Sequence, residues 1–161
     1  MDVAKSNTEK ALELSKNIKP LYVEQKPWGR TELLFYSPFF QLNRVYIERG
    51  GYSSIHYHKT KENYFFVFEG KLLINQFRNI LGKAECKENL PKEYFLEDRY
   101  IRTSNDLLLK AKTLSVPALR LHQFYALTDV IGIEWYVQSQ AGVDISLEDI
   151  IRVTQNGKEV H

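Results

Sequence analysis

The stretch HYHKTKENYFF, residues 56–66, places two histidines one residue apart and follows them with Glu62 and Asn63 ahead of an aromatic run. Side chains of an extended strand alternate between its two faces, so His56 and His58 point to the same side. Two imidazoles on one face can share a single metal ion. Taken alone, the pair is equally compatible with a chance arrangement on a solvated strand.

The aromatic run that ends this stretch is apolar on both faces. Tyr64, Phe66 and Phe68 alternate with Phe65 and Val67, and a strand that is apolar on both sides is buried on both sides. In a small barrel the outer face of such a strand needs a cover. We therefore predict a homodimer, with the N-terminal segment as the competing cover.

The middle of the chain is dominated by short segments rich in β-branched and aromatic residues, punctuated by turn formers such as Gly50-Gly51 and Gly70. Many short strands without helical spacers predict an antiparallel sandwich or barrel. The predicted strands are FFQLNRVYIE (39–48), SSIHYH (53–58), NYFFVF (63–68), KLLINQF (71–77), LLLKAK (107–112), TLSVP (113–117), LHQFYAL (121–127) and IGIEWYVQ (131–138).

Helices are predicted only near the two ends of the chain. Ser6 and Glu9 match a capping box that would begin a helix extending to about Lys16. Ser146 and Asp149 predict a short C-terminal helix in SLEDIIRV, residues 146–153. The charged stretch 78–106 shows neither period, and we expect a long loop that covers a binding mouth.

Composition excludes several classes of function. The chain has 161 residues, and its 22 basic and 20 acidic side chains form no block of like charge, so we expect no nucleic-acid or membrane partner. Cys86 is the single cysteine, which rules out an intrachain disulfide and a thiolate metal cluster. With no apolar run typical of a signal or a membrane span, the sequence predicts a cytoplasmic protein.

Glycine, proline and histidine spacing extends the pattern beyond the opening stretch. Gly50 precedes His56 by six residues, Gly70 closes the next strand, and His122 follows Pro117 by five. This spacing resembles the two motifs of the cupin superfamily. The resemblance implies an all-β cupin (double-stranded β-helix, jelly-roll) barrel with short terminal helices, residues 1–20 as a helical extension and 21–161 as the cupin domain with its core at 39–138. It also implies one divalent metal ion (Zn, Fe, Mn or Ni) on His56, His58, His122 and a fourth ligand.

The fourth position departs from the family pattern. Counting back from Gly70 places Asn63 where the family has its glutamate, and displaces Glu62 by one residue. Strand parity favours Asn63 as the inward metal ligand, whereas a β-bulge would turn Glu62 inward. In the second motif Ala111 and Leu119 replace both glycines, and Ala126 replaces an asparagine.

Two flanking segments narrow the resemblance. QKPWGR (25–30) and SLEDIIRV (146–153) look like segments of sugar-related cupins similar to the C-terminal domain of type II mannose-6-phosphate isomerases. The implied function is aldose–ketose isomerisation or epimerisation of a sugar phosphate. Glu62 would be the catalytic base if it turns inward, and Arg120 would bind the phosphate or a carboxylate, unless it is a surface ion-pair residue.

Two other hypotheses remain open. The loss of the family glutamate and of both glycines favours a non-catalytic cupin that binds a sugar or small anion, with a degenerate metal site. A three-histidine iron oxygenase is permitted by the histidines, although no other residue requires it.

Overall fold

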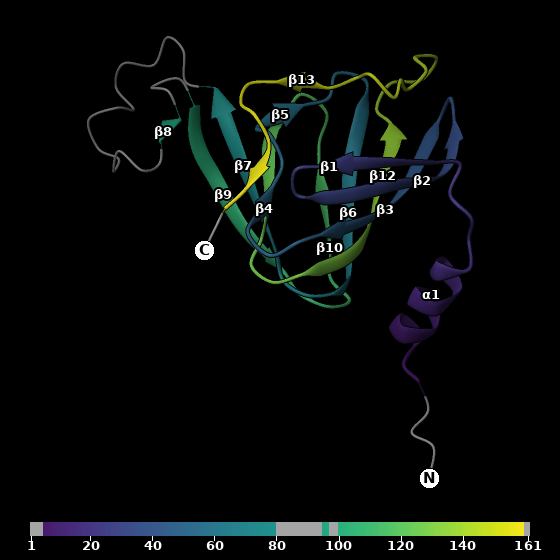
Figure 1. Cartoon of the computed structure of the whole chain (residues 1–161). Coiled ribbons are helices and arrows are strands. Elements are labelled where there is room, and N and C mark those ends of the chain that lie inside the picture. The colour runs from purple at the N-terminus through teal and green to yellow at the C-terminus, as the bar shows by residue number, and fades with distance from the viewer. Residues whose placement is uncertain (1–4, 80–94, 97–99, 160–161) are drawn as a thin grey trace.

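The computed structural model describes residues 5–79, 95–96 and 100–159 of the chain. One helix, α1 (Asn7–Lys16), precedes two antiparallel sheets that face each other (Figure 1). The first sheet has the order β1 (Tyr22–Lys26), β2 (Gly29–Ser37), β3 (Phe40–Ile47), β12 (Val130–Gln138), β6 (Lys61–Glu69) and β10 (Thr113–Val116). The second has the order β13 (Ile151–Arg152), β5 (His56–Tyr57), β11 (Leu121–Ala126), β7 (Leu72–Asn79), β9 (Tyr100–Leu108) and β8 (Phe95–Leu96), while β4 (Gly51–Tyr52) pairs with β11 and with β14 (Gly157–Lys158).

The hydrophobic core lies between the two sheets. Val45 and Phe65 from the first sheet meet Ile74 and Phe124 from the second, and all four are buried. Trp28, which follows β1, packs edge-on against Phe124 with ring centroids 5.0 Å apart. The apolar core between two antiparallel sheets confirms the predicted all-β jelly-roll architecture.

The side chains at the start of strand β6 alternate regularly between the inner and outer faces of the sheet. Asn63 is buried and points between the sheets, whereas Glu62 lies on the outer face. The pairing of β6 with β12 shifts register only between Ile131 and Gly132, near the far end of β6. No bulge therefore occurs at Glu62, and the condition under which this residue would turn inward is not met.

The prediction of a helix at residues 146–153 was wrong. The Ser146 hydroxyl accepts the N–H of Glu148, two residues on, and so closes a turn. The Asp149 carboxylate accepts instead from the N–H groups of Lys59 and Thr60. A local turn thus takes the Ser146 side chain and tertiary partners take that of Asp149, and the chain continues into β13.

The positions of several strands also differ from the prediction. Strand β9 ends at Leu108, so the predicted strand at 107–112 is mostly turn. The same strand begins at Tyr100, inside the stretch 78–106 that was predicted as a loop; most of that stretch lies outside the described residues. Strands β1 and β2 were not predicted, because their charged and aromatic residues do not alternate cleanly.

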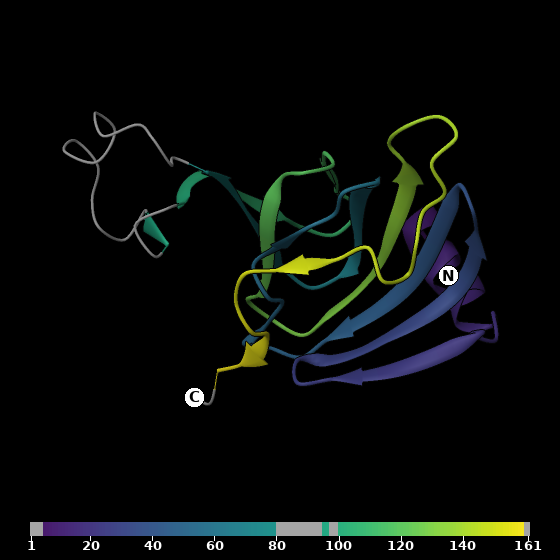
Figure 2. The same ribbon diagram turned by 90° about the horizontal axis from the view of Figure 1, so that it is seen from above.

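The N-terminal helix forms with its predicted capping box. The Ser6 N–H donates to Glu9 Oε2 at 2.9 Å, and the Glu9 N–H donates to Ser6 Oγ at 3.3 Å. At the other end of the helix, Arg44 from β3 donates to the Ser15 carbonyl and pairs with the buried Glu32 carboxylate. These contacts hold α1 against the outside of the first sheet (Figures 1 and 2), so the helix covers part of that face.

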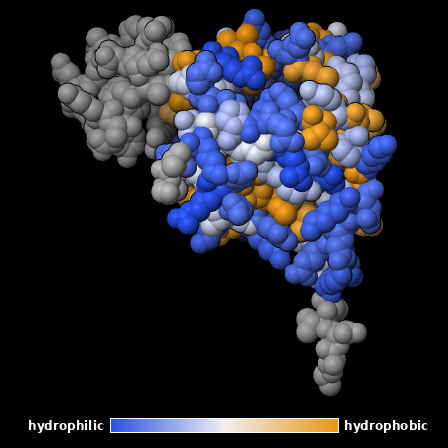
Figure 3. All heavy atoms as spheres, in the orientation of Figure 1, coloured by the Kyte–Doolittle hydropathy of each residue, from blue (hydrophilic) through white to orange (hydrophobic). Residues whose placement is uncertain are grey.

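The surface in Figure 3 is predominantly hydrophilic, with small separate hydrophobic clusters. Within the described ranges, α1 is too short and too polar for a bilayer-spanning helix, and no other helix occurs there.

Candidate metal centre and its cavity

Three histidines converge between the sheets. His56 lies on β5, His58 follows that strand directly, and His122 lies on β11 opposite His56 in the strand register. Their candidate ligand nitrogens all lie within 4.8 Å of one another, and all three side chains are buried. Two segments 66 residues apart thus supply one compact group of imidazoles.

Backbone carbonyls fix the tautomer of each ring. A carbonyl oxygen can only accept a hydrogen bond, so each Nδ1 that contacts one carries the proton and leaves the Nε2 lone pair free. The contacts are from His56 to the Ser54 carbonyl at 2.7 Å, from His122 to the Arg120 carbonyl at 2.9 Å, and from His58 to the Asp149 carbonyl.

The protonation states also fit a metal ligand set. Burial lowers the pKa of His58 to about 3, that of His122 to about 4, and that of His56 well below its ordinary value. The rings are therefore neutral at pH 7, as metal binding requires. His58 Nε2 is buried and has no hydrogen-bond partner in the part of the chain that the structure describes. A divalent cation would satisfy this orphaned acceptor, so the three histidines fit a metal ion.

Asn63 lies beside this group, as strand parity had suggested. Its Nδ2 lies 3.3 Å from His122 Nε2 and donates to Glu134 Oε1 at 2.9 Å. The amide therefore presents its nitrogen to the histidines, and it would have to turn over to offer Oδ1 as a ligand. Glu62 is on the other face of β6, where its carboxylate accepts from the Tyr64 hydroxyl at 2.9 Å.

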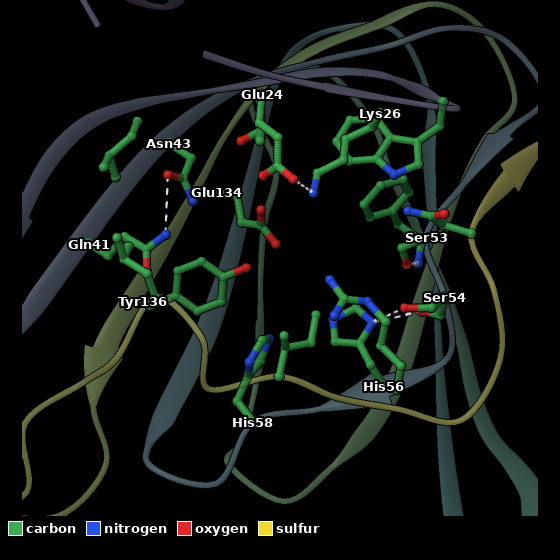
Figure 4. Close-up of a pocket in the computed structure, with 18 of the residues that line it drawn as sticks. Glu24, Lys26, Gln41, Asn43, Ser53, Ser54, His56, His58, Glu134 and Tyr136 are labelled. Atoms are coloured by element: carbon green, nitrogen blue, oxygen red, sulfur yellow. Dashed lines mark hydrogen bonds and ion pairs between the residues drawn. The ribbon is translucent and has the colours of Figure 1, made fainter. Parts of the chain in front are cut away.

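Glu134 is the functional candidate that sequence reasoning missed. It lies on β12, lines the cavity, and points toward the open space that His56 and His58 face (Figure 4). Burial raises the pKa of Glu134, and this effect outweighs the hydrogen bonds with Asn63 and Tyr136, which lower the pKa. The sequence does place Glu134 and Tyr136 on one face of β12. The opposite face carries isoleucines, however, and this pattern favours the isoleucine face as the one that points to the core.

A cavity of about 230 Å³ extends from the histidines between the sheets. Figure 4 shows Glu24 and Glu134 across the cavity from His56, while Tyr136 lies beside His58, with ring centroids 5.0 Å apart. The polar and charged lining includes Glu24, Lys26, Gln41, Asn43, Lys61, Glu134, Tyr136 and Arg152. A small polar ligand with several hydroxyl groups would therefore find hydrogen-bond partners on every wall.

Lys61 is a buried cation in this lining. Its Nζ donates to the Ser146 carbonyl at 2.9 Å and lies 4.3 Å from the centre of the Tyr136 ring. Burial lowers the pKa of Lys61 to about 8, although the nearby Asp149 and Glu134 carboxylates favour the charged form. At pH 7 the ammonium group stays charged, and it contributes a fixed positive charge to the cavity.

Asp149 attaches the C-terminal segment, residues 146–156, to the metal motif. Its carboxylate accepts from the Lys59 N–H at 2.9 Å and from the Thr60 N–H and hydroxyl at 2.8 Å each, while its carbonyl accepts from His58. Burial opposes ionisation, but the hydrogen bonds outweigh it and hold the pKa of this carboxyl below its usual value. The same segment supplies one wall of the cavity.

The Arg120 side chain is not among the residues that line the cavity. The backbone carbonyl of Arg120 does contribute to the site, because it accepts a hydrogen bond from His122 and orients that ring. The structure thus brings the backbone of Arg120 to the histidines and leaves its guanidinium outside the cavity wall.

Both family glycine positions of the second motif keep a left-handed backbone. Ala111 and Leu119 each have φ of 63°, and no other non-glycine residue in the described ranges has a positive φ. The Leu119 N–H donates to the His58 carbonyl at 2.7 Å, and the Ala111 N–H to the Val67 carbonyl at 2.8 Å. The backbone at both turns thus has the left-handed conformation that glycine adopts at least cost, although neither residue is glycine.

No family model and no curated protein matches the sequence, but many solved structures resemble the fold. CapF from Staphylococcus aureus, a capsular polysaccharide assembling protein, superposes with a TM-score of 0.57 at 19% identity over 87% of this chain and 34% of its own. KdgF from Halomonas sp. gives 0.53 at 13% identity, covering 74% and 89%. Oxalate decarboxylase from Bacillus subtilis gives 0.57 at 11% identity, covering 82% and 30%.

This chain therefore spans about a third of the length of CapF and of oxalate decarboxylase. At these identities the similarity establishes the fold and not the activity. The two facing antiparallel sheets superpose on structures that are themselves cupins. The chain has the cupin fold.

Proposed function

We propose that this chain is a metal-dependent cupin enzyme that isomerises or epimerises a small sugar, with a sugar phosphate as the first candidate substrate. The metal would be held by His56, His58 and His122. Three protein nitrogens leave coordination positions open for substrate, as in catalytic rather than structural metal sites. The convergence of three oriented Nε2 atoms beside an open cavity that contains a carboxylate carries this proposal.

Glu134 is the proposed proton acceptor in place of Glu62. Isomerisation moves a proton between two adjacent carbons, so one carboxylate must accept it from the carbon beside the carbonyl and return it to the neighbouring carbon. Glu134 borders the cavity, whereas Glu24, the other carboxylate in the lining, pairs with Lys26. A bound divalent cation would polarise the carbonyl and hydroxyl oxygens of the substrate.

The cavity and the fold neighbours support a substrate with adjacent oxygen atoms. The volume of about 230 Å³ is below that of sites for drug-sized ligands, roughly 300–1,000 Å³. One CapF structure contains the inhibitor 3-isopropenyl-tropolone, and tropolones carry a carbonyl beside a hydroxyl, as does a ketose. This substrate class is consistent with the many hydrogen-bonding side chains of the cavity.

Proton abstraction provides a direct test. The purified protein is assayed for metal content and is then incubated in D₂O with mannose 6-phosphate or fructose 6-phosphate, with deuterium incorporation followed by NMR. We expect bound metal and exchange in the native protein. His58→Ala should lose both, and Glu134→Gln should keep the metal while its exchange rate falls by about 10²–10⁴-fold.

Three controls sharpen this test. Glu69→Gln, on the exposed end of β6, should behave as the native protein. Loss of exchange in Glu62→Gln but not in Glu134→Gln would assign the base to Glu62 and overturn the assignment made here. Iron with oxygen uptake, and no deuterium exchange, would favour the oxygenase hypothesis.

A binding cupin is the second candidate, because the structure shows no carboxylate at the fourth ligand position. Saturable sugar binding without any deuterium exchange would establish it. Complete absence of metal from protein purified and refolded with zinc would contradict the metal-dependent enzyme and would leave the binding function.

The homodimer remains a prediction that the exposed apolar residues of β1 and β2 support. Helix α1 covers only part of the first sheet, and Leu21, Val23 and Phe35, in or next to β1 and β2, stay exposed. Light scattering coupled to gel filtration would measure the mass of the particle. A Val23→Lys variant should be monomeric if the interface lies at this edge.

A further inference from the structure

Arg152 stands directly beside the histidine group. Strand β13 pairs with β5 so that Arg152 lies opposite His56, and β5 pairs with β11 so that His56 lies opposite His122. Residues directly opposite each other in antiparallel strands project their side chains to the same face. The three side chains therefore form one row across the second sheet, and Arg152 lines the cavity at its mouth, where it is exposed.

The guanidinium of Arg152 differs from the other cavity cations in its bonding. Lys26 pairs with Glu24, and Lys61 donates to the Ser146 carbonyl. Over the ranges that the structure describes, the Arg152 side chain makes no hydrogen bond and no ion pair with protein. All five of its N–H donors remain available to a ligand in the cavity.

The two carboxylates of the described cavity lining lie away from Arg152. Glu24 and Glu134 lie on the wall across from His56 (Figure 4), whereas Arg152 is the cross-strand neighbour of His56. Glu24 and Glu134 share their wall with the cations Lys26 and Lys61, whereas Arg152 has no carboxylate partner among the residues that the structure describes. A metal cation on the histidines would add positive charge beside Arg152 and would favour an anionic group there. Asp149, three residues before Arg152, holds β13 in this position through its bonds to Lys59 and Thr60.

We propose that Arg152 binds an oxyanion group of the substrate, a phosphate or a carboxylate, immediately beside the metal-binding histidines. The planar guanidinium matches both groups with two parallel N–H···O bonds. This inference rests on the proposed function for the identity of the neighbouring metal site, and it moves the anion subsite from Arg120 to Arg152.

Calorimetric titration of inorganic phosphate and of acetate, into metal-free and zinc-loaded protein at low salt, tests the subsite. We expect Arg152→Gln to weaken binding about tenfold or more in both forms, because a charge-assisted hydrogen bond is lost. Arg152→Lys should be intermediate, since it keeps the charge but not the fork. Arg49→Gln, at an exposed turn away from the cavity lining, is the matched control.

Equal phosphate and acetate affinities in native protein and Arg152→Gln would overturn the proposal, as would a loss confined to Arg120→Gln. A larger loss for phosphate than for acetate assigns a phosphate ester, and the reverse assigns a carboxylate. Failure of the metal site is scored separately: protein that takes up no zinc but binds phosphate through Arg152 retains the subsite and refutes the metal enzyme. Zinc uptake by protein whose phosphate affinity is unchanged in Arg152→Gln refutes the subsite and retains the metal site.

Discussion

One amide links the candidate base to the metal group: Asn63 Nδ2 donates to Glu134 at 2.9 Å and lies 3.3 Å from His122 Nε2. The side chain is 1% exposed, and its Oδ1 has no partner among the described residues. Asn63 thus joins two buried acceptors, and its own Oδ1 is a third acceptor without a partner among the described residues.

Asn63→Asp should destabilise metal-free protein and strengthen metal binding. The substitution removes a donor shared by two acceptors and adds a charge beside Glu134, for a cost of about 1–3 kcal/mol. With zinc, the same carboxylate becomes an anionic fourth ligand. Thermal unfolding in EDTA and in zinc should show a lower Tm without metal and a larger Tm gain with it. Asn63→Ala, which adds no carboxylate, should show the lower Tm without metal but no larger Tm gain with zinc. An equal zinc-dependent Tm gain in both variants would count against Asn63 as a ligand position.

Asp149→Ala should weaken metal binding although Asp149 is not itself a ligand. Its carboxylate secures the backbone of Lys59 and Thr60, and its carbonyl orients the His58 ring. Loss of partners that orient a ligand typically costs 10–100-fold in metal affinity. Competition with a zinc-sensitive dye measures the change. The neighbouring Glu148→Ala, an exposed position, should leave affinity unaltered, and a similar loss in both variants would refute a specific role for Asp149.

Leu119→Gly should stabilise the protein. Leu119 is 68% exposed with φ of 63°, so little packing is lost, while a left-handed backbone costs a non-glycine residue about 1–2 kcal/mol. After the greater unfolded-state entropy of glycine is subtracted, the expected gain is about 0.5–1 kcal/mol. Urea unfolding would detect it. Leu119→Ala keeps the strained backbone and should show no gain, and equal stability of the two variants would exclude strain at this turn.

Metal-free protein should lose stability as the pH falls below about 6.5. Histidines in the unfolded chain have a pKa near 6.5, whereas burial lowers the pKa of His122 to about 4 and that of His58 to about 3 in the fold. The unfolded state therefore binds more protons across this window, and each histidine contributes a slope approaching 1.4 kcal/mol per pH unit, which is about the free energy of one pKa unit.

Urea unfolding in EDTA between pH 7.5 and 5 would measure this slope. His122→Asn should reduce it by about one proton. The raised pKa of Glu134 adds stability as the pH falls, in the native protein and in His122→Asn alike. The difference in slope between the two proteins therefore reports on His122. Identical slopes would show that His122 is not held neutral in the fold.

The sequence predicted the parts of the site that depend on local spacing. An HxH pair on a strand and a histidine at the family distance were sufficient to place three imidazoles together, and the parity of β6 was sufficient to distinguish Asn63 from Glu62. Glu134 and Arg152 could not be predicted, because their positions depend on pairing between strands far apart in the chain. Arg152 in particular lies in a segment with helix-capping residues, and only the pairing of β13 with β5 places it opposite His56.

The bond between His58 and Asp149 joins residues 91 positions apart. During synthesis the two histidines of the opening stretch leave the ribosome long before the carbonyl that orients one of them, and His122 also follows later. A nascent chain with only its first motif exposed would hold two unoriented imidazoles and no cavity. A metal ion held by these three histidines would therefore be bound only after translation, and the ions available to the finished protein would decide which one it is.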